Sequence, residues 1–252
     1  MPNLTAHLDL GLAIAEQLGN STVERYLGSF LLGCTAPDIR VITKEAREET
    51  HFSSLYFENI GDGVRMMFQK YPSLVPIKQF NGPTRAFLAG YASHLVADET
   101  WVALFYRPYF GNTDIFPDLR WGKFLDRALQ LQMDRSALKK PSFLRIVQQR
   151  LATAIVDVDV EFIPSDVLAQ WRDWVEDMVQ RPFTWDRLQR MVWRAYKLDD
   201  PDGVLAVEYF LNDVERSIQD IYKCVPKDTI EQFRAKTVNE YLSVMKDNIE
   251  CA

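Results

Sequence analysis

The sequence predicts an all-α fold, a multi-helix bundle. Apolar residues recur every three or four positions along most of the 252-residue chain, whereas the alternation at every second position that is typical of strands is almost absent. Prolines separate the helical segments at short intervals, as in bundles with short connections. No linker rich in Gly, Ser or charge marks a boundary. We therefore expect a single all-α domain over residues 1–252, with its distinctive motifs in about residues 4–100 and a helical remainder over 112–252.

Start and stop residues bound the first helices. Leu4, Leu8, Leu12 and Ala15 predict a first helix that stops at Gly19-Asn20. Ser21 or Thr22 is the expected N-cap of a second helix, which runs through Tyr26 to Gly33. Ala36-Pro37-Asp38 must leave helical geometry, because proline restricts the residue before it and has no amide hydrogen to donate. Asp38 is therefore expected at a sharp corner.

The rest of the chain also has a helical pattern. Residues 52–71 are expected to form a helix that is weak at Gly61 and Gly63, and the strongest helix runs from Arg85 to about Tyr106. Small residues at positions 90, 92, 93 and 97 of that helix let neighbouring helices approach closely. Amphipathic helices follow near 119–135, 142–155, 165–180, 184–197, 203–223 and 227–248.

Composition excludes several classes of protein. With 47% apolar and 12% aromatic residues, the chain can form a core, which excludes a disordered protein. At this length it should bury about three quarters of its unfolded surface, so that it needs neither metal nor disulfide merely to fold. The formal charge is −6 and no basic stripe is present, so nucleic acid is not expected as a partner.

The cysteines and the apolar segments indicate a reduced, cytoplasmic protein. Cys34, Cys224 and Cys251 are odd in number and form no C-x-x-C, which argues against a disulfide framework. The first residues lack the basic cluster and the unbroken apolar stretch of a signal peptide. The longest nearly apolar run, about a dozen residues over 86–97, is too short for a transmembrane segment. The oligomeric state is not indicated.

All three histidines lie in the first hundred residues. His94 and Asp98 are spaced i, i+4, which places an imidazole and a carboxylate on one helix face with Cβ atoms about 5–6 Å apart, close enough to bind one cation. Asp38 at its corner and His51 just before an apolar helix can complete a set of two nitrogen and two oxygen donors. That donor set suits Zn²⁺, and Fe or Mn is compatible with it.

Each residue also has a purely structural interpretation. A single His on an apolar face is more often a hydrogen-bonded core residue than a ligand, and an isolated Asp38 is most often a cap. A helical binding or scaffolding protein with a structural or relic metal site is therefore an alternative to an enzyme. A phosphohydrolase built on adjacent His-Asp pairs is disfavoured, because the chain has no His-Asp dipeptide.

Four segments occur in the order, and with roughly the spacing, of one known family. They are Leu4-Thr5-Ala6-His7, Leu32-Gly33-Cys34-Thr35-Ala36-Pro37-Asp38-Ile39, Thr50-His51-Phe52 and Ala89-Gly90-Tyr91-Ala92-Ser93-His94-Leu95-Val96-Ala97-Asp98. Over about residues 4–100 the chain resembles the zinc-dependent phospholipase C family of the phospholipase C and single-strand nuclease superfamily, in particular its uncharacterised intracellular bacterial members. The resemblance implies a phospholipase C/nuclease-like all-α fold.

The resemblance assigns metal ligands residue by residue. It implies that Asp38, His51, His94 and Asp98 surround one metal ion, and that His7 binds a second ion which Asp98 bridges to the first. The secreted phospholipases and the nucleases hold a third metal with two later histidines and a glutamate. This chain has no histidine after His94, so a third ion is expected to be absent or held by carboxylates alone. One or two zinc ions are thus expected.

The implied activity is metal-dependent hydrolysis of a small phosphoester or a phospholipid head group. A metal-activated water would attack, without a Ser or Cys nucleophile. Asp38, if it bonds only loosely to metal, is the candidate to orient that water or accept its proton. Arg107, Arg120 and Arg127 are candidate phosphate partners. In the secreted members the terminal amine is itself a ligand, and here the start of the chain is within reach of the metal at His7.

Overall fold

The computed structural model describes residues 1–189 and 201–246, and every regular element in these ranges is helical. The all-α prediction is confirmed. The elements up to Trp101 are α1 (Leu4–Leu18), α2 (Ser21–Arg25), α3 (Leu27–Gly33), η1 (Ala36–Ile39), α4 (Arg40–Thr43), α5 (Arg47–His51), α6 (Asp62–Lys70), η2 (Pro72–Leu74), η3 (Ile77–Gln79) and α7 (Gly82–Trp101). They are followed by η4 (Val102–Phe110), α8 (Leu119–Leu138), α9 (Pro141–Leu151), α10 (Ser165–Gln180), α12 (Pro201–Asn212), α13 (Val214–Cys224) and α14 (Thr229–Met245).

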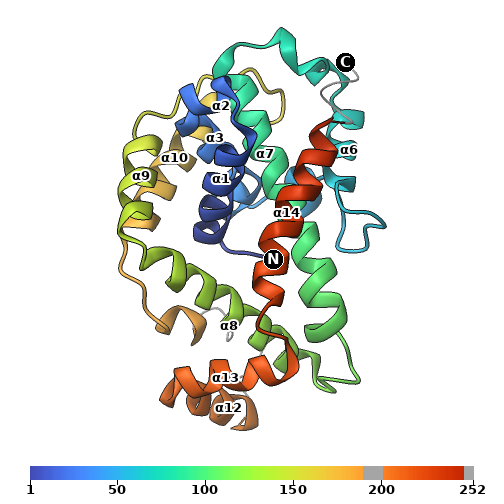
Figure 1. The fold of residues 1–252 in the computed structure, drawn as a ribbon, viewed down its shortest axis with the longest axis vertical. Helices are drawn as coiled ribbons and strands as arrows, with labels where there is room; N and C mark the ends of the chain where they lie inside the picture. The colour runs from blue at the N-terminus through green and yellow to red at the C-terminus, as the bar shows by residue number, and fades with distance from the viewer. Residues whose placement is uncertain (190–200, 247–252) are drawn as a thin grey trace.

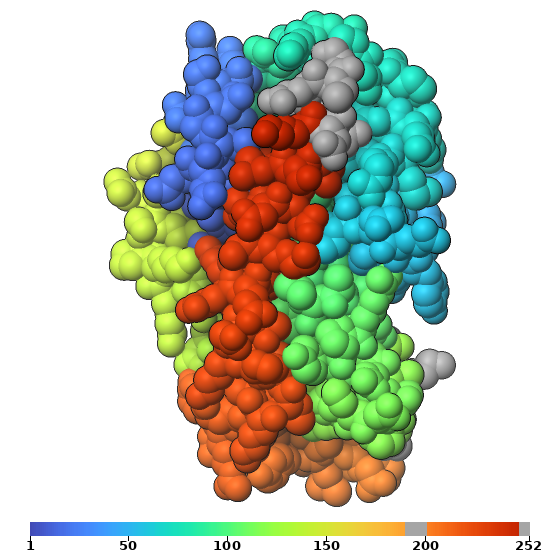
Figure 2. All heavy atoms as spheres, turned by 45° about the vertical axis from the view of Figure 1, so that its right-hand side comes forward, coloured from blue at the N-terminus to red at the C-terminus, as the bar shows by residue number. Residues whose placement is uncertain are grey.

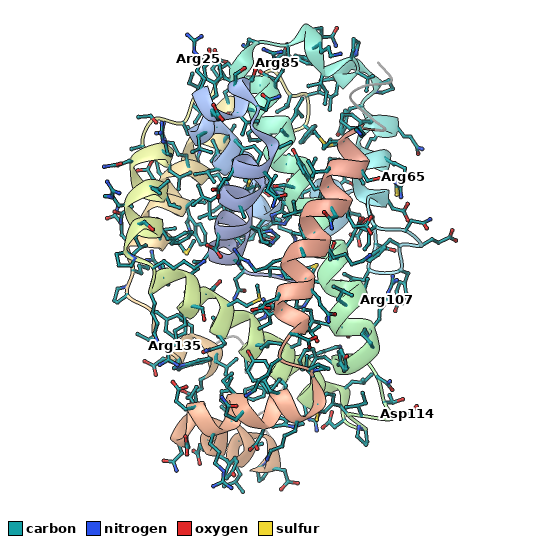
Figure 3. The ribbon with its side chains drawn as sticks, viewed as in Figure 1. Arg25, Arg65, Arg85, Arg107, Asp114 and Arg135 are labelled. Carbon is teal, nitrogen blue, oxygen red and sulfur yellow. The ribbon has the colours of Figure 1, made fainter. Side chains whose placement is uncertain are left out.

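Helix α7 is the central element of the bundle. It packs against α1, α2, α3, α6 and α14, while α8 crosses beyond the start of α1, and α12 and α13 close the far end (Figure 1). Figure 2 shows α14 running along one face of the molecule. Exposed charged side chains such as Arg25 and Asp114 project outward from the bundle (Figure 3). Within the described ranges, no helix combines the length and the apolar character that crossing a bilayer requires.

Two apolar clusters form the core. Phe30, Phe87 and Tyr91 belong to a cluster around α3 and α7, and Trp101 and Phe124 belong to a second where α7, η4 and α8 meet. Helix α7 is buried along almost its whole length from Thr84 to Trp101. A helix that is buried on nearly all sides is a core element, here one that also carries buried polar residues. The prediction of one domain over residues 1–252 stays a prediction.

The expected helix over 52–71 forms only in its second half. Phe52 ends α5 in a left-handed conformation with φ 60°, and the next helix begins at Asp62. The Asp62 carboxylate accepts hydrogen bonds from the backbone amides of Glu58 and Asn59, so that this segment forms a turn ahead of the helix. Local hydrogen bonding of this kind competes with helix formation.

Other helix boundaries also differ from the prediction. The expected helix over 203–223 is divided at Asp213, whose side chain accepts a hydrogen bond from the Arg216 amide and starts α13. Tyr26 likewise divides the expected second helix. The strongest helix continues past Trp101 as the π-helical η4. Residues 190–197 of the helix expected over 184–197 lie outside the described residues.

Helices α3 and α7 cross at close range because a glycine of each faces the backbone of the other. A Cβ atom at Gly90 would lie 1.9 Å from the Phe30 carbonyl oxygen, and one at Gly33 would lie 2.1 Å from the Phe87 carbonyl oxygen. Neither contact can be relieved by a side-chain rotation. The predicted close approach at position 90 is therefore present, and it fixes how α7 lies against α3.

We expect Gly90→Ala to destabilise the fold by about 1–3 kcal/mol, because overpacking at a backbone contact forces the two helices apart. The measurement is the free energy of urea unfolding. Gly19→Asn serves as the control, because Gly19 has φ +53°, a Cβ atom added there would meet nothing within 4 Å, and asparagine tolerates that conformation. Equal stability of Gly90→Ala and the wild type would contradict the crossing as described.

A buried polar face of α8 supports the start of α1. Asp126, Gln130 and Asp134 follow one another at i, i+4 and i+8, and all three are buried. The Asp134 Oδ2 atom accepts a hydrogen bond from the Asn3 side chain at 3.1 Å, and the Ala6 backbone amide favours the ionised form of the carboxyl group. Asp134 therefore lies beside the first turn of α1, where Asn3 makes no side-chain cap of its own. Burial raises the pKa of Asp134 to about 7.

This raised pKa predicts a pH-dependent stability. Between about pH 4 and pH 7 the folded protein holds a proton on Asp134 that the unfolded chain has lost, so the free energy of unfolding falls as the pH rises through that window. Asp134→Asn has no proton to lose there. We expect its stability relative to the wild type to rise by up to about 4 kcal/mol from pH 4 to pH 8. Urea unfolding at several pH values measures this difference, and a difference independent of pH would contradict it.

Candidate metal centre

Helix α7 supplies the predicted pair His94 and Asp98. Both side chains are buried, with 1% and 2% of their surface exposed. The His94 Nε2 atom lies 3.8 Å from Asp98 Oδ2, as the i, i+4 spacing on one helix face predicts.

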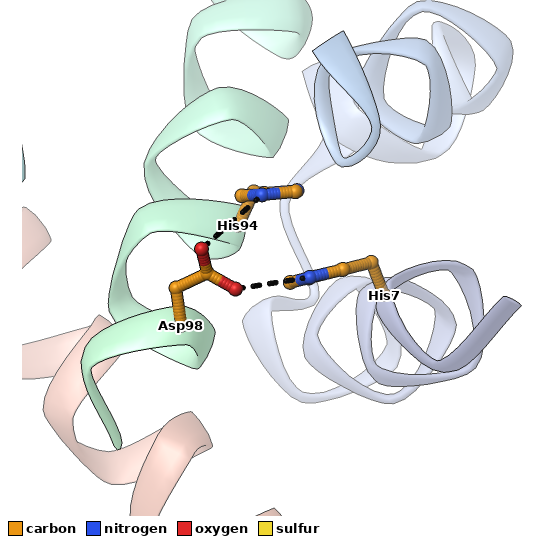
Figure 4. Close-up of side chains that lie close together, drawn as sticks. All are labelled: His7, His94 and Asp98. Atoms are coloured by element: carbon orange, nitrogen blue, oxygen red, sulfur yellow. Dashed lines mark ion pairs between the residues drawn. The ribbon is translucent and has the colours of Figure 1, made fainter. Parts of the chain in front are cut away.

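Helix α1 brings His7 to the other oxygen of the same carboxylate. His7 Nε2 lies 3.3 Å from Asp98 Oδ1, and the His7 ring stacks on that of His94 with 3.7 Å between ring centroids (Figure 4). The stacking keeps both rings in place beside Asp98. The two helices therefore converge on one buried carboxylate.

Two short elements complete the group. His51, the last residue of α5, has its Nε2 atom 3.3 Å from Asp98 Oδ2 and 3.7 Å from Asp38 Oδ1. Asp38 lies in η1, the corner that Pro37 predicts, and 27% of its side chain is exposed. The five predicted site residues thus lie together, and Asp38 is the most exposed of them.

Hydrogen bonds at the far side of two rings point their Nε2 atoms at the group. The Cys34 carbonyl oxygen lies 2.8 Å from His94 Nδ1, and an acceptor there keeps the proton on Nδ1. The Thr50 hydroxyl lies 3.0 Å from His51 Nδ1. Tyr91 donates from its hydroxyl to the Thr50 carbonyl and so ties α5 to α7. In the neutral tautomer with Nδ1 protonated, Nε2 of His94 presents a lone pair to the centre.

The atoms that face one another lack hydrogen-bond partners. Nε2 of His7, His51 and His94 and Oδ1 of Asp98 are all buried and make no hydrogen bond. Buried polar atoms are normally satisfied, so four such atoms in one place call for an explanation. Imidazole nitrogen and carboxylate oxygen are the donors that Zn²⁺ takes. The residues present therefore fit a metal ion.

The protonation states also suit a metal. Burial, together with the neighbouring His7 and His51 rings, lowers the pKa of His94 well below its usual value, so that this ring is neutral. Burial alone would raise the pKa of Asp98, but the polar contacts of the histidine rings around it and the positive charge of Arg47 hold it well below its usual value. A metal ion can bind an ionised carboxylate and a neutral imidazole without displacing a proton from either group.

The donors form two overlapping groups. His7, His94 and Asp98 make one, and Asp38, His51 and His94 make the other, with the candidate ligand atoms of each group within 4.8 Å of one another. His94 belongs to both, and its Nδ1 atom is engaged by Cys34. The two groups therefore share one nitrogen of His94, the Nε2 atom. The arrangement is compatible with one ion or with two.

Sequence reasoning missed Arg47. Its Nη2 atom donates to Asp98 Oδ2 at 3.0 Å, while its Nε and Nη1 atoms are buried without a partner. The available signal was its i, i+4 spacing from His51 on a short helix. Arg47 places a positive charge directly beside the candidate ligands.

The three arginines named as candidate phosphate partners bind other groups of the protein. Arg107 donates to backbone carbonyls in the 55–57 segment, Arg127 donates to the Asn3 side chain and to α8, and Arg120 pairs with Asp118. None of these contacts joins them to the five-residue group.

The start of the chain packs beside the centre. Pro2 is buried, and a sulfur contact joins Met1 to Arg47. Burial lowers the pKa of the Met1 amine, an effect that the negative charges of Asp126 and Asp98 oppose. The amine is thus near enough to Asp98 to interact with it, and metal ligation by a terminal amine stays a prediction.

Comparison with known proteins agrees with the sequence motifs. Residues 6–101 match the family model described as zinc dependent phospholipase C, which confirms the resemblance over that part of the chain. The match contains all five residues of the candidate centre. Searches among curated proteins and among solved structures give no match.

The purified protein is expected to carry one to two equivalents of transition metal, and His94→Ala should lose most of it, because His94 Nε2 serves both donor groups. Elemental analysis by mass spectrometry measures the content. Cys224→Ser is the control, since it removes an exposed free thiol that is not part of either group. Full metal content in folded His94→Ala protein would exclude a metal site built from these five residues.

Proposed function

We propose that this chain, whose residues 6–101 match the zinc-dependent phospholipase C family, is a metal-dependent phosphoester hydrolase. It would act on a small phosphoester or a phospholipid head group through a one- or two-metal site of His7, Asp38, His51, His94 and Asp98. The observation that carries this proposal is the convergence of three buried Nε2 atoms and one buried carboxylate oxygen without hydrogen-bond partners.

Zinc is the metal we propose, with iron or manganese as the alternatives. Imidazole suits zinc and iron, carboxylate suits manganese, and a mixed set of imidazoles and carboxylates does not select one of the three metals. When bound, the ion supplies a water of lowered pKa and charge stabilisation for a phosphoryl oxygen. The chain's own residues must then position the substrate and handle the proton.

Asp38 is the residue we propose to accept or direct that proton. It is the most exposed of the five side chains, so a substrate arriving from solvent reaches it first. Its Oδ1 atom lies 3.7 Å from His51 Nε2, which leaves the carboxylate adjacent to the donors without a short contact to them. A carboxylate at that position can accept a proton from an attacking water.

Arg47 is proposed to bind a phosphoryl oxygen. Its guanidinium already lies 3.0 Å from Asp98, and its Nε and Nη1 atoms have hydrogen-bonding capacity to spare. A planar guanidinium matches the geometry of phosphate oxygens. This role replaces the one expected for arginines farther along the chain.

A cysteine nucleophile is not needed. Cys34 lies close to His94 in the fold, but burial raises the pKa of its thiol to about 12. The reactive form of cysteine is the thiolate, which is scarce at that pKa. Direct attack by water therefore fits the site better.

The exposed free thiol of Cys224 supports a reducing, cytoplasmic location, which we also propose.

The test is hydrolysis of a panel of nitrophenyl phosphomonoesters, phosphodiesters and phosphorylcholine by zinc-loaded protein. Asp38→Asn should lower kcat by about 10²–10⁴-fold, the usual contribution of a positioned general base, and metal content is measured alongside. Asp9→Asn is the matched control, because Asp9 is a carboxylate of α1 that binds Lys140 and Arg234 instead.

Two results would count against the proposal. Hydrolysis that survives in His94→Ala or after chelation would separate the activity from this centre. Bound metal without hydrolysis of any ester in the panel would favour the alternative, a helical binding or scaffolding protein with a structural or relic metal site.

A further inference from the structure

A cavity of about 690 Å³ lies at the other end of α1 and α7 from the candidate metal centre. Leu18 at the end of α1 lines it, whereas His7 is near the start of that helix. Its other described walls come from α2, from η3, from the first turns of α7 and from the end of α14. The volume falls in the range of roughly 300–1,000 Å³ that is typical of small-molecule sites. None of the five candidate metal ligands lines it.

The wall of the cavity is largely apolar. Leu18, Val23, Ile77 and Ala89 contribute aliphatic surface, and Tyr241 contributes an aromatic ring. Four of these five side chains are buried, and Leu18 is half-buried. Surface of this kind favours the hydrocarbon part of a ligand over water.

Three cationic side chains also line the cavity. Lys78 comes from η3, Arg85 from the first turn of α7, and Lys246 directly follows α14. None of the three forms an ion pair in the part of the chain described here, and no acidic residue of that part lines the cavity. Three segments distant in sequence thus bring positive charge to one place without an acidic partner among residues 1–189 and 201–246, although the whole chain has a net charge of −6.

Arg85 has the strongest indication of a missing partner. It is half-buried at the end of the bundle where α2 and the start of α7 lie (Figure 3). Its Nε atom is fully buried and makes no hydrogen bond. An unpaired guanidinium N–H away from water is costly, so the described residues leave this guanidinium incompletely satisfied, and its charge stays available to an anionic ligand.

We propose that this cavity binds a long-chain fatty acid, with the acyl chain against the apolar wall and the carboxylate at Arg85 and the two lysines. A planar carboxylate matches the guanidinium fork, and an unbranched acyl chain matches the aliphatic and aromatic side chains of the wall. This site is separate from the metal centre and does not rest on the proposed hydrolase activity.

The proposal is tested by calorimetric titration of the full chain with dodecanoate below its micelle concentration. Decanoate should bind more weakly by up to about 15-fold, since each buried methylene contributes up to about fourfold. Dodecanol, which has the same chain and no charge, should bind at least tenfold more weakly than dodecanoate. Equal affinity for the acid and the alcohol would overturn the role of the cations.

Variants locate the binding. Arg85→Gln should weaken dodecanoate binding about tenfold or more, and Ser243→Trp, which adds bulk to the exposed rim, should block it while the melting temperature stays unchanged. Lys227→Gln is the control, because Lys227 is a cation that does not line the cavity. Equal affinities of Arg85→Gln and Lys227→Gln would overturn the proposal.

The metal centre must be separated from this site, because zinc also binds carboxylates. His94→Ala and chelated wild-type protein should bind dodecanoate as tightly as the untreated protein. Loss of binding in either would place the carboxylate on the metal and overturn the proposal. A further variant ends at Lys246. If this variant binds dodecanoate and the full chain does not, the cavity belongs to the chain's own C-terminal residues, and the proposal is overturned.

Discussion

The structure depends on one costly feature, an ionised carboxylate buried at the centre of the bundle. Asp98 is 2% exposed, and its pKa lies well below the usual value of an aspartate, so the side chain is ionised. Burying a charge is strongly unfavourable unless other groups compensate it. Here the compensation comes from elements far apart in the sequence: His7 from α1, His51 and Arg47 from α5, and His94 from α7 itself. The carboxylate therefore determines where α1 and α5 must lie relative to α7.

The scaffold that holds these groups is rigid for a separate reason. Gly33 and Gly90 let α3 and α7 approach until a Cβ atom on either would collide with the backbone of the other. That crossing brings the Cys34 carbonyl to His94 Nδ1 and so fixes the ring orientation on which the donor set depends. At the other side, Asp134 accepts a hydrogen bond from Asn3, the residue directly before α1, which carries His7. Backbone packing and one buried carboxylate thus help to position His94 and His7.

Most of the helices, and the grouping of the five candidate site residues, could be predicted because they follow from local spacing or from short motifs. The i, i+4 pair His94 and Asp98 needs only a helix to meet, and Pro37 is enough to place Asp38 at a corner. Arg47 was missed because its contact with Asp98 depends on tertiary packing. The turn before Asp62 was missed because carboxylate hydrogen bonds to nearby amides outweigh the apolar periodicity of that segment. Neither the long-range contact of Arg47 nor the local hydrogen bonds of Asp62 leave a periodic signal in a single sequence.

Charge balance bears on how many ions the centre holds. With neutral imidazoles, as metal ligation requires, the ionised Asp38 and Asp98 carry two negative charges and Arg47 carries one positive charge, a net charge of −1. One divalent ion brings the group to +1, which a single phosphodiester anion neutralises. Two ions bring it to +3, which in a largely buried site needs additional anions as well as the substrate. Because His94 offers one Nε2 atom to both donor groups, geometry points the same way as charge. On both grounds these residues hold one ion more readily than two, while the number of ions and the substrate stay predictions.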